Sequence, residues 1–426
     1  AALGVEVPLV VAHALAERGL RAHRRIVVPV EEAPEVSGFP ADVRAQVEAL
    51  THEQRRDLLW VDLSGAGGHA VVVGAPRSGK STLLRTLVCA LALTHTPAEA
   101  QVYGLDFGGG SLAALEGLPH VGGVAAGRDP QRCVRLVAEV RAMLTERERA
   151  FAELGLDAMA SVRERRDEAG RRLFPDVFLL IDGWTVFREQ HEKLEDDVMA
   201  LTRSGLGYGM HVVITANRWL EVRPAVRDLI GTRLELRLGD PGDSDVDRRA
   251  AAGVPEAAPG RGLARSKHHF LTALPRIDGR GSTTDLSDGL AGLVATVARS
   301  WRGPVAPPVR LLPAHVALAE LPAPAGGGLL VPFGVAEADL APVDLDFDAE
   351  PHLVVLGDVE SGKTTALATI AAGLTRFPPQ RARLVIADYR RALLGTIDHE
   401  TSLVFVGAAM FAVGVGVGMV MQNLVL

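Results

Sequence analysis

The hydrophobic residues between positions 58 and 300 fall into two alternating patterns. Short continuous apolar runs are typical of strands buried on both faces of a parallel sheet, and apolar residues spaced by three and four are typical of helices. The patterns predict strands at 58–63, 70–73, 101–105, 177–181, 211–215 and 233–238, and helices at 82–93, 130–154, 194–203 and 286–300. Because strands alternate with helices, we predict an α/β domain whose mostly parallel sheet is covered by helices on both faces.

Weaker patterns occur on either side of these elements and between them. Residues 1–54 are an N-terminal segment of uncertain fold, with helical spacing at 9–20 and 41–50 and a candidate strand at 25–30. Residues 239–285 are rich in Gly, Pro, Asp and Arg and have no strong period, which predicts loop and connector.

A Pro- and Gly-rich stretch at 303–328 predicts a linker. It separates a first domain at 55–302 from the start of a second domain at 329–400. In the second domain, strands are predicted at 331–334, 343–347, 352–356 and 384–387.

The tail 401–426 carries no charged residue, and 403–420 is an unbroken run of apolar residues and glycine. A run of this length reaches the threshold for a membrane span. Three interpretations stay open. The tail is a buried strand and helix of the second domain, or sequence foreign to that domain joined at a fragment or frame boundary, or a transmembrane helix.

Lysine is rare in this chain, with four among the 45 basic residues, and two of the four occupy the same motif. The phosphate-binding pattern G-x-x-x-x-G-K-[ST] is matched by Gly74-Ala75-Pro76-Arg77-Ser78-Gly79-Lys80-Ser81 and by Gly357-Asp358-Val359-Glu360-Ser361-Gly362-Lys363-Thr364. A compact ammonium reaches the β and γ phosphates where the planar fork of arginine is too bulky. The chain is therefore predicted to bind a nucleoside triphosphate at two sites.

The two loops belong to a repeat. The second copy is offset by 283 residues from Gly74 to Gly357, and its strand that ends in Asp388 takes the place of the strand that ends in Asp106. A repeat of this length is a duplicated domain rather than a solenoid unit. The second copy is much shorter than the first, so one full domain and a partial second copy are expected.

The first loop follows an apolar strand and precedes a helix, so its backbone N–H groups are expected to wrap phosphates at a helix N-terminus. Gly74 and Gly79 permit the tight turn, and Lys80 neutralises the phosphate charge. The hydroxyl of Ser81 is the predicted Mg²⁺ ligand, and Thr364 takes the same role in the second loop. The threonines that follow each motif complete the predicted binding residues, Thr82 and Thr365.

Asp182 ends the apolar run 177–181, the position from which an aspartate holds Mg²⁺ through water. Hydrolytic ATPases of this broad type usually place a glutamate next, where this chain has Gly183. Loss of such a group lowers the rate by on the order of 10²–10⁴. Glu189 and Glu192 lie further along and are expected to be out of reach, so weak or no hydrolysis of ATP is predicted.

Other candidate residues carry weaker signals. Thr215 and Asn217 follow a buried strand and are either sensors of the γ-phosphate and water or an ordinary polar strand end. Arg233 and Arg248 are candidates for a residue presented to a neighbouring subunit's nucleotide. The arginines at 163–172 alternate with acidic residues, which indicates a solvated helix face. The pair His268-His269 has no partner at metal-ligand spacing.

The composition limits the class of protein. A net charge of −7 gives no global basic field, so a nucleic-acid partner is not expected. The two cysteines, Cys89 and Cys133, fall in helical patterns and are expected to be core residues rather than a disulfide, which favours a cytoplasmic compartment. The sequence begins with Ala-Ala-Leu, has no clear signal peptide and is expected to be a fragment.

The chain resembles the FtsK/SpoIIIE-type ATPases and, more narrowly, the EccC ATPases of type VII secretion systems. The resemblance covers roughly residues 55–400 and is specific in combination. It is carried by the segments 62–69 (DLSGAGGH), 106–111 (DFGGGS), 118–124 (LPHVGGV), 182–184 (DGW), 211–217 (HVVITAN), 260–262 (GRG), 269–276 (HFLTALPR) and 357–365.

The resemblance implies a RecA/FtsK-like P-loop NTPase fold that binds ATP and Mg²⁺. EccC-like proteins carry three such domains in series, and this chain is similar to the second followed by the start of the third. The later domains are described as binding ATP without the catalytic glutamate, which agrees with Gly183. Implied partners are other subunits or domains of a secretion ATPase, arranged in a hexameric ring, and small helical-hairpin substrates. The implied location is the inner face of the cell membrane, on the cytoplasmic side.

The tail after Glu400 does not resemble the family, and the first 50 residues match it poorly. The second copy also stops before its own Mg²⁺-binding strand, which leaves substrate binding open. Two alternatives to a secretion motor remain. One is an FtsK-like DNA translocase fragment, which needs a basic pore and a DNA-reading module. The other is a non-catalytic interaction module without affinity for ATP.

Overall fold

The computed structural model describes residues 26–27, 59–63, 65, 67–162, 173–322, 328–337, 340–387, 393, 404–406 and 419–422. The chain divides into two compact units, 1–309 and 310–426, and each is described by itself. The helices predicted at 9–20 and 41–50 and the arginine-rich stretch 163–172 lie outside the described residues.

The described part of the first unit contains an eight-stranded sheet in the order β10-β9-β8-β3-β7-β6-β4-β5. The six strands from β8 to β5 are parallel, and β9 and β10 continue the sheet antiparallel at one edge. The bounds are β3 (Ala70–Val73), β4 (Ala100–Asp106), β5 (Val121–Ala126), β6 (Asp176–Asp182), β7 (Met210–Ala216), β8 (Thr232–Leu236), β9 (Arg261–Ala264) and β10 (His269–Leu271). The predicted mostly parallel α/β fold is confirmed.

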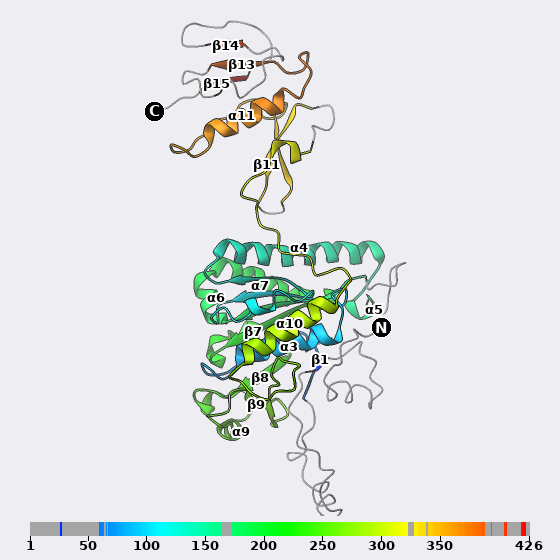
Figure 1. The fold of residues 1–426 in the computed structure, drawn as a ribbon, viewed down its shortest axis with the longest axis vertical. Coiled ribbons are helices and arrows are strands. Elements are labelled where there is room, and N and C mark those ends of the chain that lie inside the picture. The colour runs from blue at the N-terminus through cyan, green and yellow to red at the C-terminus, as the bar shows by residue number, and fades with distance from the viewer. Residues whose placement is uncertain are drawn as a thin grey trace, which may run out of the picture. The chain divides into compact units, whose positions relative to one another are not determined.

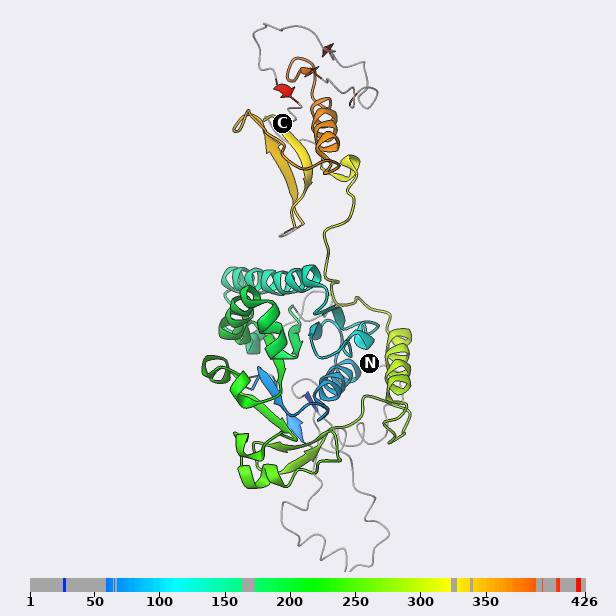
Figure 2. The same ribbon diagram turned by 90° about the vertical axis from the view of Figure 1, so that its left-hand side faces the viewer.

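Helices cover both faces of this sheet (Figures 1 and 2). On β3, Ala70 and Val72 join the core formed with α3 and α10, whereas Val71 and Val73 join the core formed with α4, α6 and α7. A strand buried on both faces needs no polar alternation, which explains its continuous apolar run. The helices are α3 (Lys80–Thr94), α4 (Pro130–Leu154), α6 (Trp184–Gln190), α7 (Glu192–Ser204) and α10 (Leu286–Ser300).

The stretch 239–285, predicted as loop and connector, is more ordered than its composition suggests. It contains a 3₁₀ turn at Pro241–Asp243, the short helix α9 (Arg248–Ala252) and the strands β9 and β10. These strands are short, and the antiparallel pairing with β8 stabilises β9. Pairing between strands distant in sequence leaves little periodic signal in such short segments.

The start and end of the first unit also contact its sheet and helices. β1 (Ile26–Val27), within the N-terminal segment, pairs antiparallel with β2 (Trp60–Val61). At the other end, the chain after α10 follows β5, where Ala306 N donates to Pro119 O at 2.8 Å and Val309 N to Gly122 O at 3.0 Å. The first residues of the stretch predicted as a linker are therefore fixed on the first unit.

The second unit repeats part of this plan. A hairpin of β11 (Leu330–Val335) and β12 (Pro342–Asp346) packs on α11 (Lys363–Leu374). β13 (Leu384–Ala387) pairs in parallel with one short strand on each side, and these are β14 (Val404–Val406) and β15 (Met419–Gln422). Both flanking strands belong to the apolar tail, and most of the run between them lies outside the described residues. Within the described ranges, no helix has the length and apolar character needed to cross a bilayer.

The strand predicted at 352–356 is wrong. These residues have no strand pairing in the described structure, and Val354 and Leu356 are 77% and 88% exposed. In the first unit the corresponding strand β3 lies between β7 and β8, which come much later in the chain. No described strand of the second unit takes these two places, so the apolar run has no partner for its backbone.

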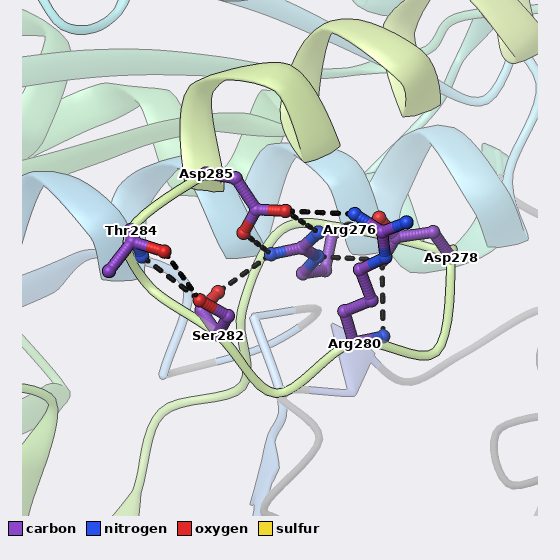
Figure 3. A network of polar contacts seen from close by, with 6 residues as sticks. All are labelled: Arg276, Asp278, Arg280, Ser282, Thr284 and Asp285. Atoms are coloured by element: carbon purple, nitrogen blue, oxygen red, sulfur yellow. Dashed lines mark hydrogen bonds and ion pairs between the residues drawn. The ribbon is translucent and has the colours of Figure 1, made fainter.

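Arg276 ties the loop before α10 together (Figure 3). Its guanidinium donates to both oxygens of Asp278 at 2.6 and 2.5 Å, and to both oxygens of Asp285 at 2.7 and 3.1 Å. It also donates to Ser282 O at 2.6 Å. A Cβ at Gly289 would lie 2.9 Å from Arg276 Nε, so a glycine inside α10 leaves room for the guanidinium. The hydrogen bonds from Arg276 raise its own pKa and lower the pKa of Asp278 to about 2.

We expect Arg276→Lys to lower the midpoint of thermal unfolding, because one ammonium cannot bind two carboxylates in the bidentate way that a guanidinium does. Arg280→Lys is the matched control, since the side chain of Arg280 is 70% exposed and, among the described residues, donates to Asp285 alone. All four tryptophans belong to the first unit, so their fluorescence follows its unfolding. An equal midpoint for the two variants would contradict the expectation.

His69 lies between the start of β3 and the start of β7 and is completely buried. Its Nδ1 accepts from Val212 N at 2.9 Å, so its Nε2 carries the proton and donates to Thr202 O at 2.9 Å. Burial lowers the pKa of His69 from 6.5 to about 4, assisted by the charge of His211 and opposed by the bond to Thr202. The ring is therefore neutral in the folded protein at neutral pH.

A histidine whose pKa is lowered by folding contributes stability above pH 6.5 that is lost as the pH falls toward 4. For His69 we expect a loss of about 2 kcal/mol in unfolding free energy between pH 7.5 and pH 5. His69→Asn should be less stable at pH 7.5 but should lose about 2 kcal/mol less on acidification. Urea denaturation at both pH values measures this, with the exposed His315→Asn as control. An unchanged pH dependence in His69→Asn would refute the assignment.

Candidate nucleotide-binding site

The first phosphate loop connects β3 to α3 and is anchored by the neighbouring strands. Gly74 N donates to Ala216 O at the end of β7 at 3.1 Å, and Ala75 N donates to Arg237 O just after β8 at 2.8 Å. These are the strands on either side of β3, so the sheet order determines where the loop lies. The site is at the carboxyl ends of parallel strands, where ligands of open α/β sheets bind.

The loop backbone needs glycine. Gly79 has φ of 104°, and a Cβ there would lie 2.8 Å from Gly260 N. Gly260 has φ of 89° and donates to Ser78 O at 2.7 Å, which joins the Gly260-Arg-Gly segment to the loop. Within the described residues, α3 has no side-chain cap at its N-terminus. Its first N–H groups are therefore available to an anion, as in other phosphate loops.

Lys80 uses its three N–H donors on the loop and on the next strand. Its Nζ donates to Gly74 O at 2.6 Å, to Ala75 O at 3.0 Å and to Asn217 Oδ1 at 3.0 Å. Burial lowers the pKa of Lys80, and the carboxylates of Asp182 and Glu221 oppose that shift. An incoming phosphate must replace at least one of these three bonds, because an ammonium has no further donor.

Asp182 joins the helix after the loop to the sheet. Ser81 Oγ donates to Asp182 Oδ2 at 2.6 Å, and Thr215 Oγ1 donates to Asp182 Oδ1 at 2.6 Å. The carboxylate is buried, and a Cβ at Gly108 would lie 2.7 Å from its Cγ, so only glycine fits beside it. A hydroxyl and a carboxylate that converge within hydrogen-bonding distance are the oxygen ligands that Mg²⁺ prefers, with water and phosphate completing its shell. These residues fit an Mg²⁺–nucleotide complex.

Gly183 has a backbone that excludes a side chain. Its φ is 90°, and an added Cβ would lie 3.1 Å from the carbonyl carbon and oxygen of Phe107. Its N–H donates to Thr215 Oγ1 at 2.8 Å, which fixes the turn between β6 and α6. A glutamate at this position would be strained in backbone conformation and would press on the backbone of Phe107.

The structure brings several other predicted residues to the site. Thr215 and Asn217 contact Asp182 and Lys80 directly, rather than forming a passive strand end. Glu189 and Glu192 are both exposed, on α6 and at the start of α7.

The arginine candidates differ from each other. Arg233 donates to Asp245 Oδ2 at 2.7 Å and to Arg227 O at 2.9 Å, so its guanidinium is already engaged within the first unit. Arg248 is exposed as the first residue of α9. Arg233 is therefore poorly suited to reach a neighbouring subunit.

Two residues that shape the site were not among those predicted from the sequence. Asp106 accepts from the backbone N–H groups of Gly108, Gly110 and Leu112 at 3.1, 2.9 and 2.7 Å, which folds the glycine-rich turn toward Asp182. Its signal was present, as a strand-terminal aspartate followed by three glycines after Phe107. Glu221 accepts from Asn217 N at 2.8 Å and had no comparable signal, because it lies in an irregular segment.

The second loop repeats the backbone of the first. Glu360 and Gly362 have φ of 62° and 87°, against 61° at Arg77 and 104° at Gly79. Lys363 Nζ donates to Gly357 O at 2.7 Å and also to Asp358 O, as Lys80 does to its own loop. The loop is largely exposed, and Asp388, which ends the strand that takes the place of β4, lies outside the described residues.

We expect Thr215→Val to lower the free energy of unfolding of the first unit by about 1–3 kcal/mol, because Asp182 loses a donor and the N–H of Gly183 loses its acceptor. Thr272→Val is the matched control. Thr272 is also buried, and its Oγ1 has no hydrogen-bond partner within the described residues, so little change is expected. Urea denaturation followed by tryptophan fluorescence compares the two. Equal effects would show that the contact to Asp182 contributes nothing.

Comparison with known proteins agrees with this geometry. Residues 37–278 match the model of the FtsK/SpoIIIE family. The chain is 53% identical over 353 residues to the ESX secretion system protein EccC of Thermomonospora curvata, covering 82% of this chain and 27% of that protein. It therefore spans about a quarter of the length of this relative.

Two solved structures from Thermomonospora curvata are similar at 48% identity and cover 91% of this chain. One is the cytoplasmic domain of the type VII secretion ATPase EccC, with a TM-score of 0.77 and 43% of that chain covered. The other is EccC (ATPases 2 and 3) in complex with a signal sequence peptide, with a TM-score of 0.75 and 67% covered. The chain belongs to the FtsK/SpoIIIE family of P-loop ATPases and, within it, to the group of EccC ATPases of type VII secretion systems.

Proposed function

We propose that this chain is the ATP-binding segment of an EccC-like type VII secretion motor, which holds Mg²⁺–ATP at the first loop and hydrolyses it slowly or not at all. The observation that carries the proposal is the arrangement around Asp182. Ser81 and Thr215 donate to Asp182, and Lys80 is held by the phosphate loop and Asn217, while the backbone of Gly183 disfavours a side chain where hydrolytic ATPases of this broad type carry a carboxylate. The site is therefore better suited to binding than to turnover.

The roles of the site residues follow from their contacts. Lys80 and the first N–H groups of α3 hold the phosphates, and Ser81 with Asp182 holds Mg²⁺, which neutralises phosphate charge when bound. Asn217 accepts a hydrogen bond from Lys80 through its side chain, so it senses whether the ammonium of Lys80 has moved to a phosphate. Bound nucleotide stabilises the folded arrangement of α3, β6 and β7, because it binds the folded state alone.

The surroundings of the motor are part of the proposal. One solved relative contains EccC ATPases 2 and 3 in complex with a signal sequence peptide. From the family resemblance we infer that this chain works with other subunits or domains of a secretion ATPase, in a hexameric ring, on small helical-hairpin substrates. Its place is the cytoplasmic side of the membrane. The second loop, with Thr364 as Mg²⁺ ligand, contributes a further nucleotide site in the longer protein.

Equilibrium binding of Mg²⁺–ATP to the whole chain tests the proposal. Lys80→Ala should weaken the affinity by roughly 10–100-fold, because it removes charge-assisted hydrogen bonds worth about 1.5–3 kcal/mol. Lys267→Ala is the matched control, since Lys267 is 63% exposed and pairs with Asp247 away from the loop. Both variants are made with Lys363→Ala, so that only the first loop is measured.

Three results would overturn the proposal. Absence of Mg²⁺–ATP binding would favour a non-catalytic interaction module. Turnover of several ATP per second that Lys80→Ala abolishes would refute a binding site with weak hydrolysis. Salt-dependent binding of duplex DNA would favour a DNA translocase.

A further inference from the structure

We propose that Glu221 supplies the carboxylate that orients and deprotonates the attacking water at the first loop, in place of a side chain at Gly183. The inference rests on the proposed function, because it requires ATP to bind at Lys80. It assigns the slow turnover of the site to one residue outside the phosphate-loop and Mg²⁺ motifs.

Glu221 lies next to the turn that lacks the usual glutamate. It ends the 3₁₀ segment Trp219–Glu221 after β7, and its Oε2 accepts from Asn217 N at 2.8 Å. The same oxygen accepts from Thr185 Oγ1 at 2.8 Å. Thr185 stands two residues after Gly183 in the first turn of α6. The carboxylate of Glu221 therefore reaches the start of α6 from the adjacent strand.

Glu221 is also electrostatically connected to the phosphate lysine. Asn217 donates its backbone N–H to Glu221 and accepts from Lys80 Nζ with its side chain. Burial lowers the pKa of Lys80, and the negative charges of Asp182 and Glu221 act against that shift. Asn217 therefore connects the carboxylate of Glu221 to the lysine that contacts the β and γ phosphates in phosphate loops.

The segment that carries Glu221 is held firmly. Arg188 Nη1 donates to Glu221 O at 3.3 Å, and Arg188 Nε donates to Glu195 Oε1 at 2.9 Å. On the other side, Trp219 Nε1 donates to the buried Glu235 Oε1 at 2.5 Å. A general base works best when its position is fixed before the reaction, as these contacts achieve.

One oxygen of Glu221 remains for water. Both described hydrogen bonds of the carboxylate use Oε2, and the residue is half-buried rather than sealed. In the reaction, Oε1 accepts a proton from water as the water oxygen bonds to the γ-phosphorus. The bond from that phosphorus to the bridging oxygen breaks, and ADP leaves with its electron pair. Glu221 then returns the proton to solvent.

Other carboxylates near the loop are already engaged. Asp106 accepts three backbone N–H groups, and Asp182 accepts from Ser81 and Thr215. Glu189 and Glu192 are exposed, and no described hydrogen bond joins either to the residues around Lys80. Among the described residues, Glu221 is the acid with both a connection to Lys80 and an available oxygen.

Glu221→Gln tests the assignment in the whole chain carrying Lys363→Ala. The side-chain carbonyl of glutamine can still accept from Asn217 N and Thr185 Oγ1, so the variant removes basicity and keeps both contacts. With protein in excess over ATP, we expect the single-turnover rate to fall roughly 10²-fold. Equilibrium binding of Mg²⁺–ATP should stay within about threefold of the parent. Glu189→Gln, on the exposed side of α6, should change neither value.

Each outcome decides between the two proposals. If the parent does not bind Mg²⁺–ATP, the proposed function fails and this inference with it. If the parent binds ATP but shows no turnover, or if the Glu221→Gln variant turns over as fast as the parent, only this inference is overturned. If Glu221→Gln weakens binding as much as turnover, Glu221 positions Asn217 and is not the base.

Discussion

The rest of the site depends on the two hydrogen bonds that the carboxylate of Asp182 accepts. The buried carboxylate of Asp182 accepts one hydrogen bond from the hydroxyl of Ser81 on α3 and one from the hydroxyl of Thr215 on β7, at 2.6 Å each. A buried charge is tolerated only with such partners, so β6, β7 and the helix after the loop must keep their relative positions. The parallel order β3-β7-β6 places Ser81, Thr215 and Asp182 at the carboxyl ends of these strands. Hydrophobic burial on both faces of the sheet stabilises that order.

Comparison of the two phosphate loops shows that the loop conformation depends on local sequence, whereas the strand before the loop depends on neighbouring strands. Arg77 and Glu360 have nearly the same positive φ, and the two lysines bind the carbonyls of their own loops in the same way. That conformation follows from the local glycine pattern. The strand before the loop does not, because Val354 and Leu356 are exposed while β3 is fully buried. A parallel strand forms only when its neighbours are present.

The same distinction explains how far the sequence could predict the molecule. The strand at Ala70–Val73 and the helices at Pro130–Leu154 and Leu286–Ser300 were predicted at their observed bounds, since each has a strong local pattern. β9 was missed because its partner β8 lies more than twenty residues earlier. At the site, motif spacing predicted Lys80, Ser81 and Asp182, and the structure brings Ser81 and Asp182 into contact. Glu221 contacts Thr185 through the packing of distant segments, which no motif spacing specifies.

Gly183 and Gly108 shape the surroundings of Asp182. Because Gly183 has φ of 90° and an added Cβ would lie 3.1 Å from the backbone of Phe107, a side chain is disfavoured in this turn, and a Cβ at Gly108 would meet the carboxylate of Asp182. The glycine-rich turn held by Asp106 is what makes these contacts. The segment after β7 brings another carboxylate, that of Glu221, to the start of α6. The surroundings of Asp182, Gly183 and Glu221 therefore all depend on β6 and β7 being parallel neighbours in the sheet.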